Sequence, residues 1–200
     1  MSRIRLIRSA WSFLLALAVA APVLATDPME EMKQTTEKIL SIVTNTGLKS
    51  PSKASERGRL IRQAVDERFD WEEMARRALA THWAKRTAEE KKEFVGLFAD
   101  LLDHTYMKKV EDYNGEKVSY EGETKEGDYA AVKVKIVTQK DKDIPVEYRL
   151  KKKENGWLIY DVSIEGVSLI NNYRTQFNSI VQQSSYENLV KRLREKADLK

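Results

Sequence analysis

The 200-residue chain contains no cysteine, and it has only 4 prolines, 8 glycines and 2 histidines. Without cysteine, disulfides cannot stabilise the fold, so stability must come from a packed core. His82 and His104 lie far apart in the sequence and lack HExxH-type spacing, so no metal site is predicted. Gly166 stands alone in EGVSL, without the further glycines of a phosphate-binding or dinucleotide-binding loop.

Long hydrophobic runs are absent once the N-terminus is passed. The exception is the apolar run at residues 11–21, which follows Arg3, Arg5 and Arg8 and precedes small or aliphatic residues up to Ala25. This pattern is typical of a cleavable signal peptide, and the run is too short to span a bilayer as a helix. We expect export with cleavage after Ala25; an uncleaved N-terminal anchor is the alternative.

A strong excess of one charge is also missing. The chain has 35 basic and 31 acidic residues. Removing the leader takes away three arginines and no acidic residue, which leaves 32 basic against 31 acidic residues and a net charge of +1. The charges are interspersed rather than clustered in a basic stripe, so the sequence does not indicate a nucleic-acid-binding protein.

Helical periodicity dominates both ends of the exported chain. Apolar residues at three- and four-residue spacing predict helices over residues 28–46, 56–68, 70–79, 87–113, 169–183 and from 186 onward. Residues with capping chemistry precede most of these segments: Asp27, Asp70, Thr87, Ser168 and Ser185. Asp70 and Thr87 are each followed by a glutamate three residues later, which is the spacing of a capping box.

The middle of the chain changes to a period of two residues. Alternation predicts strands near residues 118–120, 132–137, 144–151 and 158–165, separated by turns at 122–127, 139–143 and 155–156. Short turns between sequential strands imply an antiparallel meander. The expected fold is α+β: a curved four-stranded antiparallel sheet covered on one face by N- and C-terminal helices. We expect one domain, residues 26–200, that is mainly helical over 26–115, a sheet over 116–165 and helical over 166–200.

Catalytic patterns are not found. The chain has no GxSxG motif for a serine hydrolase. Asp161 and Glu165 could form a carboxylate pair, but they share strand parity with Arg149 and Lys151, so we expect them to face solvent. We therefore assign no catalytic residue, metal or cofactor.

Aromatic residues are the main chemical feature that remains. The predicted inward face of the sheet carries Tyr120, Tyr148 and Tyr160, and the predicted helices add phenylalanines and further tyrosines. These residues could form a close-packed core, as most apolar stripes do. Buried phenols, however, need hydrogen-bond partners, and they suit a cavity with an apolar floor and a wet mouth.

Two long segments resemble a known family. They are FDWEEMARRALATHWAKRTAEEKKEFVGLFADLLDHTY at residues 69–106 and WLIYDVSIEGVSLINNYRTQF at residues 157–177. The chain resembles the MlaC/toluene-tolerance family of periplasmic phospholipid-binding proteins, and DVSIEGVSL-x-x-x-YR-x-QF is the most specific part of the likeness. The resemblance covers essentially the whole chain after the leader, and it is weakest over residues 27–55.

The resemblance implies a soluble, monomeric carrier in the Gram-negative periplasm, with no cofactor. Such a carrier moves a glycerophospholipid between an outer-membrane lipoprotein–porin complex and an inner-membrane ABC transporter with an MCE-domain protein. The implied fold is a curved sheet wrapped by helices, related to the nuclear-transport-factor-two-like cone with a helical annex. The acyl chains would enter between the sheet and the helices.

This hypothesis makes the aromatic and aliphatic stripes a cavity wall. The expected lipid-binding residues are Phe94, Leu97, Phe98, Leu101, Tyr106, Val134, Tyr148, Tyr160, Val162, Ile164, Val167, Leu169, Ile170, Tyr173 and Phe177. Arg174 is the candidate neighbour of the lipid phosphate, and a surface salt bridge is the alternative role for it. Two alternatives remain: a periplasmic adaptor or chaperone with a filled core, and an isomerase-type enzyme on a cone fold, which would need Asp, Glu or His at an inward position of the sheet.

Overall fold

The structure is a computed structural model that describes residues 27–197; the expected signal peptide and its cleavage site lie outside these residues. The helices are α1 (Pro28–Val43), α2 (Ala54–Asp66), α3 (Trp71–Leu79), α4 (Ala88–Glu111), α5 (Leu169–Gln183) and α6 (Tyr186–Ala197). Short 3₁₀ helices occupy Thr46–Leu48, Pro51–Lys53 and Ala80–Lys85. Within the described part of the chain, no helix is long and apolar enough to cross a membrane.

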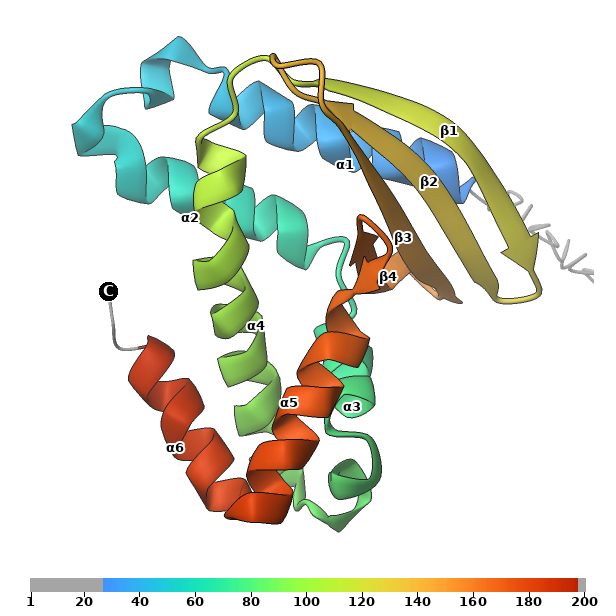
Figure 1. Ribbon diagram of the computed structural model, residues 1–200. Coiled ribbons are helices and arrows are strands. Elements are labelled where there is room, and N and C mark those ends of the chain that lie inside the picture. Colours follow the sequence, from blue (N-terminus) through green and yellow to red (C-terminus); the bar gives the residue numbers. More distant parts are fainter. Residues whose placement is uncertain (1–26, 198–200) are drawn as a thin grey trace, which may run out of the picture.

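The sheet is fully antiparallel and its strands follow one another in chain order. They are β1 (Lys117–Glu126), β2 (Tyr129–Val137), β3 (Asp143–Lys153), β4 (Gly156–Ile164) and β5 (Val167–Ser168). The expected α+β fold with an antiparallel sheet is confirmed, and β5 adds a fifth strand of 2 residues to the four expected. Figure 1 shows that the sheet is curved and that α1 lies across it.

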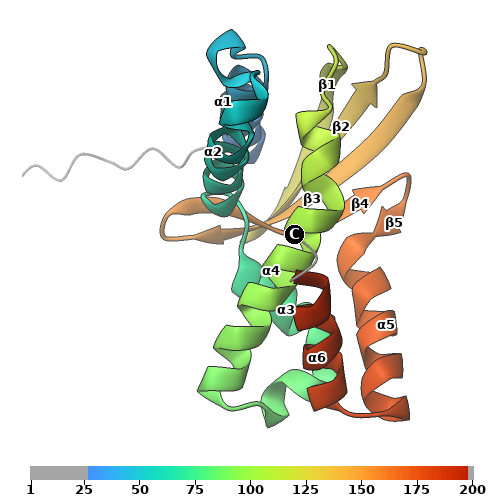
Figure 2. The ribbon, with the colours of Figure 1, turned by 90° about the vertical axis from the view of Figure 1, so that its left-hand side faces the viewer.

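The core is divided into two clusters. One cluster joins α3, α4, α5 and α6, which Figure 2 shows packed together in the lower part of the molecule, with the upper part of α4 rising beside the sheet. The other lies between α1 and the inner face of the sheet, around Met32, Val132, Leu150 and Ile159. The C-terminal helices thus pack mainly on α3 and α4 rather than across the sheet. Phe69, in the connection before α3, packs against both clusters.

The helix starts follow the capping chemistry of the sequence. Thr87 and Glu90 form the expected capping box, and Asp27, Ser168 and Ser185 each accept a hydrogen bond from a backbone N–H of the helix that follows. The Asp70 carboxylate accepts from the Glu73 N–H at 3.0 Å, so the cap is present. The expected capping box does not form at this helix, because the Asp70 N–H donates to the Ile159 carbonyl and the Glu73 carboxylate binds arginines.

A β-bulge in β4 overturns part of the expected side-chain pattern. Arg149 pairs with Asp161 but Leu150 pairs with Ile159, so Tyr160 is an extra residue. The extra residue reverses the alternation before it: Trp157 and Ile159 are buried in the sheet cluster, instead of the expected Leu158 and Tyr160. After the bulge, Val162 and Ile164 face inward as predicted.

The turn expected at residues 122–127 is wrong. β1 continues to Glu126, with a register shift between Tyr120 and Gly122, and the chain reverses only at Gly127 and Asp128. Gly122 therefore marks a bulge inside a strand, which is the other common position for an isolated glycine in a β pattern.

Candidate functional site

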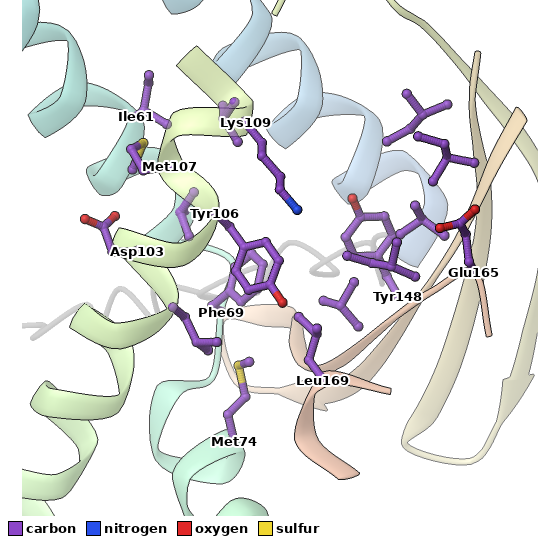
Figure 3. Close-up of a pocket in the computed structure, with 18 of the residues that line it drawn as sticks. Ile61, Phe69, Met74, Asp103, Tyr106, Met107, Lys109, Tyr148, Glu165 and Leu169 are labelled. Carbon is purple, nitrogen blue, oxygen red and sulfur yellow. The ribbon is translucent and has the colours of Figure 1, made fainter. Parts of the chain in front are cut away.

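A cavity of about 520 Å³ lies between the helices and the inner face of the sheet. Its helical wall comes from α2 and the C-terminal half of α4, through Ile61, Val65, Leu102, Tyr106, Met107 and Val110. Its sheet wall comes from β2, β3 and β4, through Ile136, Ile144, Val146, Tyr148, Val162 and Ile164. Phe69, Trp71, Met74 and Leu169 complete the apolar lining, and the polar lining residues are Asp103, Lys109, Glu116, Thr138 and Glu165. Figure 3 shows these walls facing each other.

The cavity brings together some of the residues that we expected there. Tyr106, Tyr148, Val162, Ile164 and Leu169 line it. They come from α4, β3, β4 and the first turn of α5. Strand periodicity placed Tyr148, Val162 and Ile164 correctly, because β3 and the second half of β4 alternate without interruption.

Most of the other expected lining residues lie in the helical cluster instead. Phe94, Phe98, Leu101, Ile170 and Phe177 are buried there, and Leu97, Tyr160 and Tyr173 pack against it. Ring contacts explain why no space is left: Phe98 lies 5.3 Å from Tyr173 and 5.5 Å from Phe177, centroid to centroid. α4 has 24 residues, and only its C-terminal half reaches the sheet.

Three further residues that we expected in the cavity lining lie elsewhere in the structure. Val134 is buried in the sheet cluster and does not line the cavity. Val167 is 59% exposed, because the tight turn between β4 and β5 points its side chain into solvent. Arg174 is exposed on α5, donates a hydrogen bond to the Asn171 side chain and lies outside the cavity lining.

Sequence reasoning missed the contribution of the segment from α2 to α3. Ile61, Val65, Phe69, Trp71 and Met74 line the cavity. The apolar stripe of α2 was visible in the sequence, but it carried no sign of which neighbour it would face. Its position depends on α2 packing beside α1 and α4, which is tertiary information.

Charged residues gather at one end of the cavity. Lys109 and Glu165 are exposed there, and Glu116 and Thr138 are half-buried. Glu165 pairs with Lys142 at 3.1 Å, and the Glu116 carboxylate accepts from the Asn114 N–H at 2.8 Å. Lys109 forms no ion pair within residues 27–197; its ammonium lies 5.3 Å from the centroid of the Tyr106 ring. Figure 3 shows Lys109 pointing into the space between α4 and the sheet.

The two tyrosines of the cavity remain protonated at neutral pH. Burial raises the pKa of Tyr148 to about 12, and the nearby Tyr120 adds to the effect. Burial also raises the pKa of Tyr106. Because a neutral phenol donates an O–H, both residues bring hydrogen-bond donors to walls that are otherwise apolar.

Polar residues elsewhere are engaged in structural contacts. Asp161 is buried, contrary to expectation, because it accepts from the Ser168 hydroxyl at 2.7 Å and the Ile170 N–H at 3.1 Å. His82 contacts the Asn178 side chain and His104 the Asp100 carbonyl. Among the described residues, no group of His, Asp and Glu is arranged to hold a metal ion. The arrangement is suited to enclosing an apolar ligand.

Comparisons with known proteins point in the same direction. The family model described as "MlaC protein" matches residues 33–195. The intermembrane phospholipid transport system binding protein MlaC of Haemophilus influenzae is 19% identical over 186 residues, which is 90% of this chain and 87% of that protein. A phospholipid-binding protein from Ralstonia solanacearum, solved in complex with a phospholipid, superposes with a TM-score of 0.76 at 23% identity, covering 86% of this chain and 98% of that one.

A more distant structure adds no argument. A putative NTF2-like transpeptidase from Campylobacter jejuni aligns with a TM-score of 0.41 and 17% identity over 67% of this chain. The expected likeness to a nuclear-transport-factor-two-like cone therefore stays a prediction.

Proposed function

The chain belongs to the MlaC family, and we propose on this premise that it is a phospholipid carrier that holds acyl chains in the cavity between α4 and the sheet. The observation that carries the proposal is the cavity itself. Its volume of about 520 Å³ and its apolar walls are typical of ligand-binding pockets. The names of the Haemophilus and Ralstonia proteins support the choice of phospholipid as the ligand.

The physics of lipid transfer explains why a carrier needs such walls. Two acyl chains carry roughly 30 methylene groups, and exposing each one to water costs about 0.8 kcal/mol. Free lipid would therefore face a barrier on the order of 24 kcal/mol. The cavity must replace most of the apolar contact of the bilayer without greatly exceeding it, because otherwise delivery would fail.

We place this carrier in the periplasm, between an outer-membrane lipoprotein–porin complex and an inner-membrane ABC transporter with an MCE-domain protein. The leader expected at residues 1–25 and the family support this placement. The proposed unit is a monomer formed by one domain, residues 26–200. Directional transport then depends on docking to these partners and on the ATP used by the transporter, rather than on a catalytic group in the carrier.

The two alternatives fit the structure less well. An adaptor or chaperone with a filled core would not leave a cavity of about 520 Å³ between its elements. A cone-fold enzyme would place acidic residues or histidine on the inner face of the sheet. Tyr148 and aliphatic residues occupy the cavity-facing positions of β2, β3 and β4, and Glu165 follows β4 at the rim.

Lipid extraction tests the proposal. The exported protein, purified from its native host without detergent, should yield phospholipid by mass spectrometry of an organic extract. We expect Ile164→Asp to lower the amount of bound lipid by about tenfold or more, because a carboxylate would stand in the apolar wall.

Val167→Asp is the matched control for this experiment. It adds the same charge 3 residues away, at a position that is 59% exposed and outside the cavity lining. Its lipid content should equal that of the wild type. An extract of the wild-type protein that contains no phospholipid would refute the carrier function and favour the adaptor.

A further inference from the structure

Two phenol groups stand in the apolar cavity without a protein partner. Tyr106 projects from α4 and Tyr148 from β3, and Figure 3 shows both rings in the space between the helix and the sheet. Within residues 27–197, neither hydroxyl forms a hydrogen bond to the protein. The contact of the Tyr106 side chain with Lys109 involves its ring face, not its oxygen.

Three other tyrosines of the chain do have acceptors in the protein. Tyr120, on the same inner face of the sheet, donates its hydroxyl to the Thr36 oxygen at 2.8 Å. Tyr113 donates to the Glu116 carbonyl at 3.1 Å, and Tyr186 to the Glu90 carbonyl at 3.2 Å. Among the described residues, five tyrosine hydroxyls form no hydrogen bond to the protein: those of Tyr106, Tyr129, Tyr148, Tyr160 and Tyr173. Of these five residues, Tyr106 and Tyr148 are the two that line the cavity.

The two unpartnered phenols restrict which ligands can fill the cavity. In an open cavity, water can accept their hydrogen bonds, but an acyl chain that displaces the water offers no acceptor. A buried donor left unpaired in this way weakens binding. A ligand that fits both the apolar walls and the phenols must therefore carry acceptor oxygens next to its hydrocarbon part. The ester carbonyls of a diacyl lipid have this position, between the acyl chains and the phosphate.

We propose that the Tyr106 and Tyr148 hydroxyls donate hydrogen bonds to the ester carbonyl oxygens of the bound lipid. These bonds fix the depth of the glycerol backbone, with the acyl chains against the apolar walls and the phosphate toward Lys109 at the rim. They also make the carrier selective for acyl esters over alkyl ethers. The inference rests on the proposed carrier function and adds a specificity to it.

The test compares two phosphatidylglycerols that share their chain length and differ only in ester or ether linkages. Short-chain forms are used below their micelle concentration, and affinities are measured by calorimetry on the exported protein freed of lipid. The wild type should bind the diester about two- to tenfold more tightly than the diether. Tyr106→Phe and Tyr148→Phe should each reduce this ratio, and the double variant should bring it to about one.

Tyr160→Phe is the matched control, because Tyr160 packs against the helical cluster and the Tyr129 ring outside the cavity. It should keep the wild-type ratio. The infrared band of ¹³C-labelled ester carbonyls provides a second readout on the wild type alone: hydrogen bonding should move it to lower frequency than in a dry bilayer core.

The outcomes separate this inference from the carrier function. If the wild type binds diester and diether equally, and the carbonyl band is unshifted, the inference is overturned while the carrier function stands. A preference that persists in the double variant also overturns it. If neither lipid binds to the wild type, the carrier function fails and the inference fails with it.

Discussion

Lys109 carries a positive charge at the cavity rim that the protein does not neutralise with an ion pair in the described part of the chain. The other rim charges are engaged: Glu165 with Lys142, and Glu116 with a backbone N–H. A lipid phosphate that emerges from the cavity would meet this ammonium first. Lys109 therefore replaces Arg174, which lies on α5 away from the lining, as the expected neighbour of the headgroup.

Lys109→Gln should weaken the binding of anionic phosphatidylglycerol by about two- to fivefold, as expected for an exposed charge pair. Binding of a lipid with the same chains and a zwitterionic headgroup should change less. Lys108→Gln is the control, since Lys108 precedes it on α4 and lies outside the lining. Equal anionic-lipid affinities of the two variants, measured at low ionic strength, would contradict the assignment.

Glu73 makes the stability of α3 dependent on pH. Burial by itself raises the pKa of Glu73, but hydrogen bonds from Arg76 and Arg77 outweigh it and lower the pKa from 4.5 to about 2. A carboxyl group with a lowered pKa stabilises the fold above its unfolded-state pKa, and this contribution disappears as the pH falls through the folded-state value.

Glu73→Gln should lower the free energy of unfolding at pH 7 by about 2 kcal/mol, because it removes charge-assisted hydrogen bonds. The difference from the wild type should shrink below pH 4.5 and disappear near pH 2. Urea denaturation at several pH values measures it. Glu72→Gln, at the exposed neighbouring position, should leave the pH profile of the wild type unchanged.

At the scale of elements, a buried carboxylate of α1 connects this helix to the β3–β4 hairpin. Glu31 pairs with Arg68 and accepts from the Trp157 N–H at 3.0 Å. Arg68 also donates to the Trp157 carbonyl at 2.9 Å. Gly156 makes room for this contact, because a Cβ at that position would lie 2.7 Å from the Glu31 carboxylate oxygens.

Gly156→Ala should lower the free energy of unfolding by about 2–4 kcal/mol, since it strains the backbone at φ 109° and displaces Glu31 from its partner. Gly127→Ala is the control: it stands in the β1–β2 turn at φ 56°, but a Cβ there meets nothing within 4 Å. Its cost should be about 1 kcal/mol. Equal losses in thermal unfolding would show that the Glu31 contact adds nothing.

Elements whose signals are local could be predicted from the sequence. Side chains that cap their own helix, such as Thr87 and Ser168, marked helix starts correctly. The face assignments failed where a bulge intervened, at Tyr160, because a bulge leaves no periodic trace and reverses the parity of all residues before it.

The candidate site was predictable in part for a similar reason. The apolar stripe of α4 correctly indicated a buried face, but its two halves have different neighbours. Phe94 and Phe98 meet α5 and α6, whereas Tyr106 meets the cavity. The residue types are the same in both halves, so only the packing of α5 onto α3 and of α6 onto α4 distinguishes the core from the cavity wall.

At the scale of the whole molecule, the cavity separates two hydrophobic clusters that share few residues. The helical cluster and the sheet cluster both include Phe69, which also lines the cavity. A ligand in the cavity would therefore add contacts between the two clusters that the protein does not make with its own side chains.

We expect lipid to raise the midpoint of thermal unfolding in a concentration-dependent way. At a free ligand concentration of 100 times Kd the gain is about 2.7 kcal/mol, which corresponds to roughly 5–11 °C for a chain of this size. A short-chain phospholipid below its micelle concentration is added to the protein freed of lipid, and unfolding is followed by circular dichroism. A midpoint that stays constant over the titration would show that the cavity does not bind this lipid.

The extra residue at Tyr160 also sets a rule for length changes in β4. On one face of this strand, Trp157 and Ile159 pack with the sheet cluster while Val162 and Ile164 reach the cavity. Because the strand has one extra residue between the two pairs, deleting Tyr160 would restore regular alternation and keep both pairs on the inner face, whereas deleting both Tyr160 and Asp161 would expose one pair to water. Single deletions between the two pairs should therefore be tolerated better than double deletions, which a library of length variants can check.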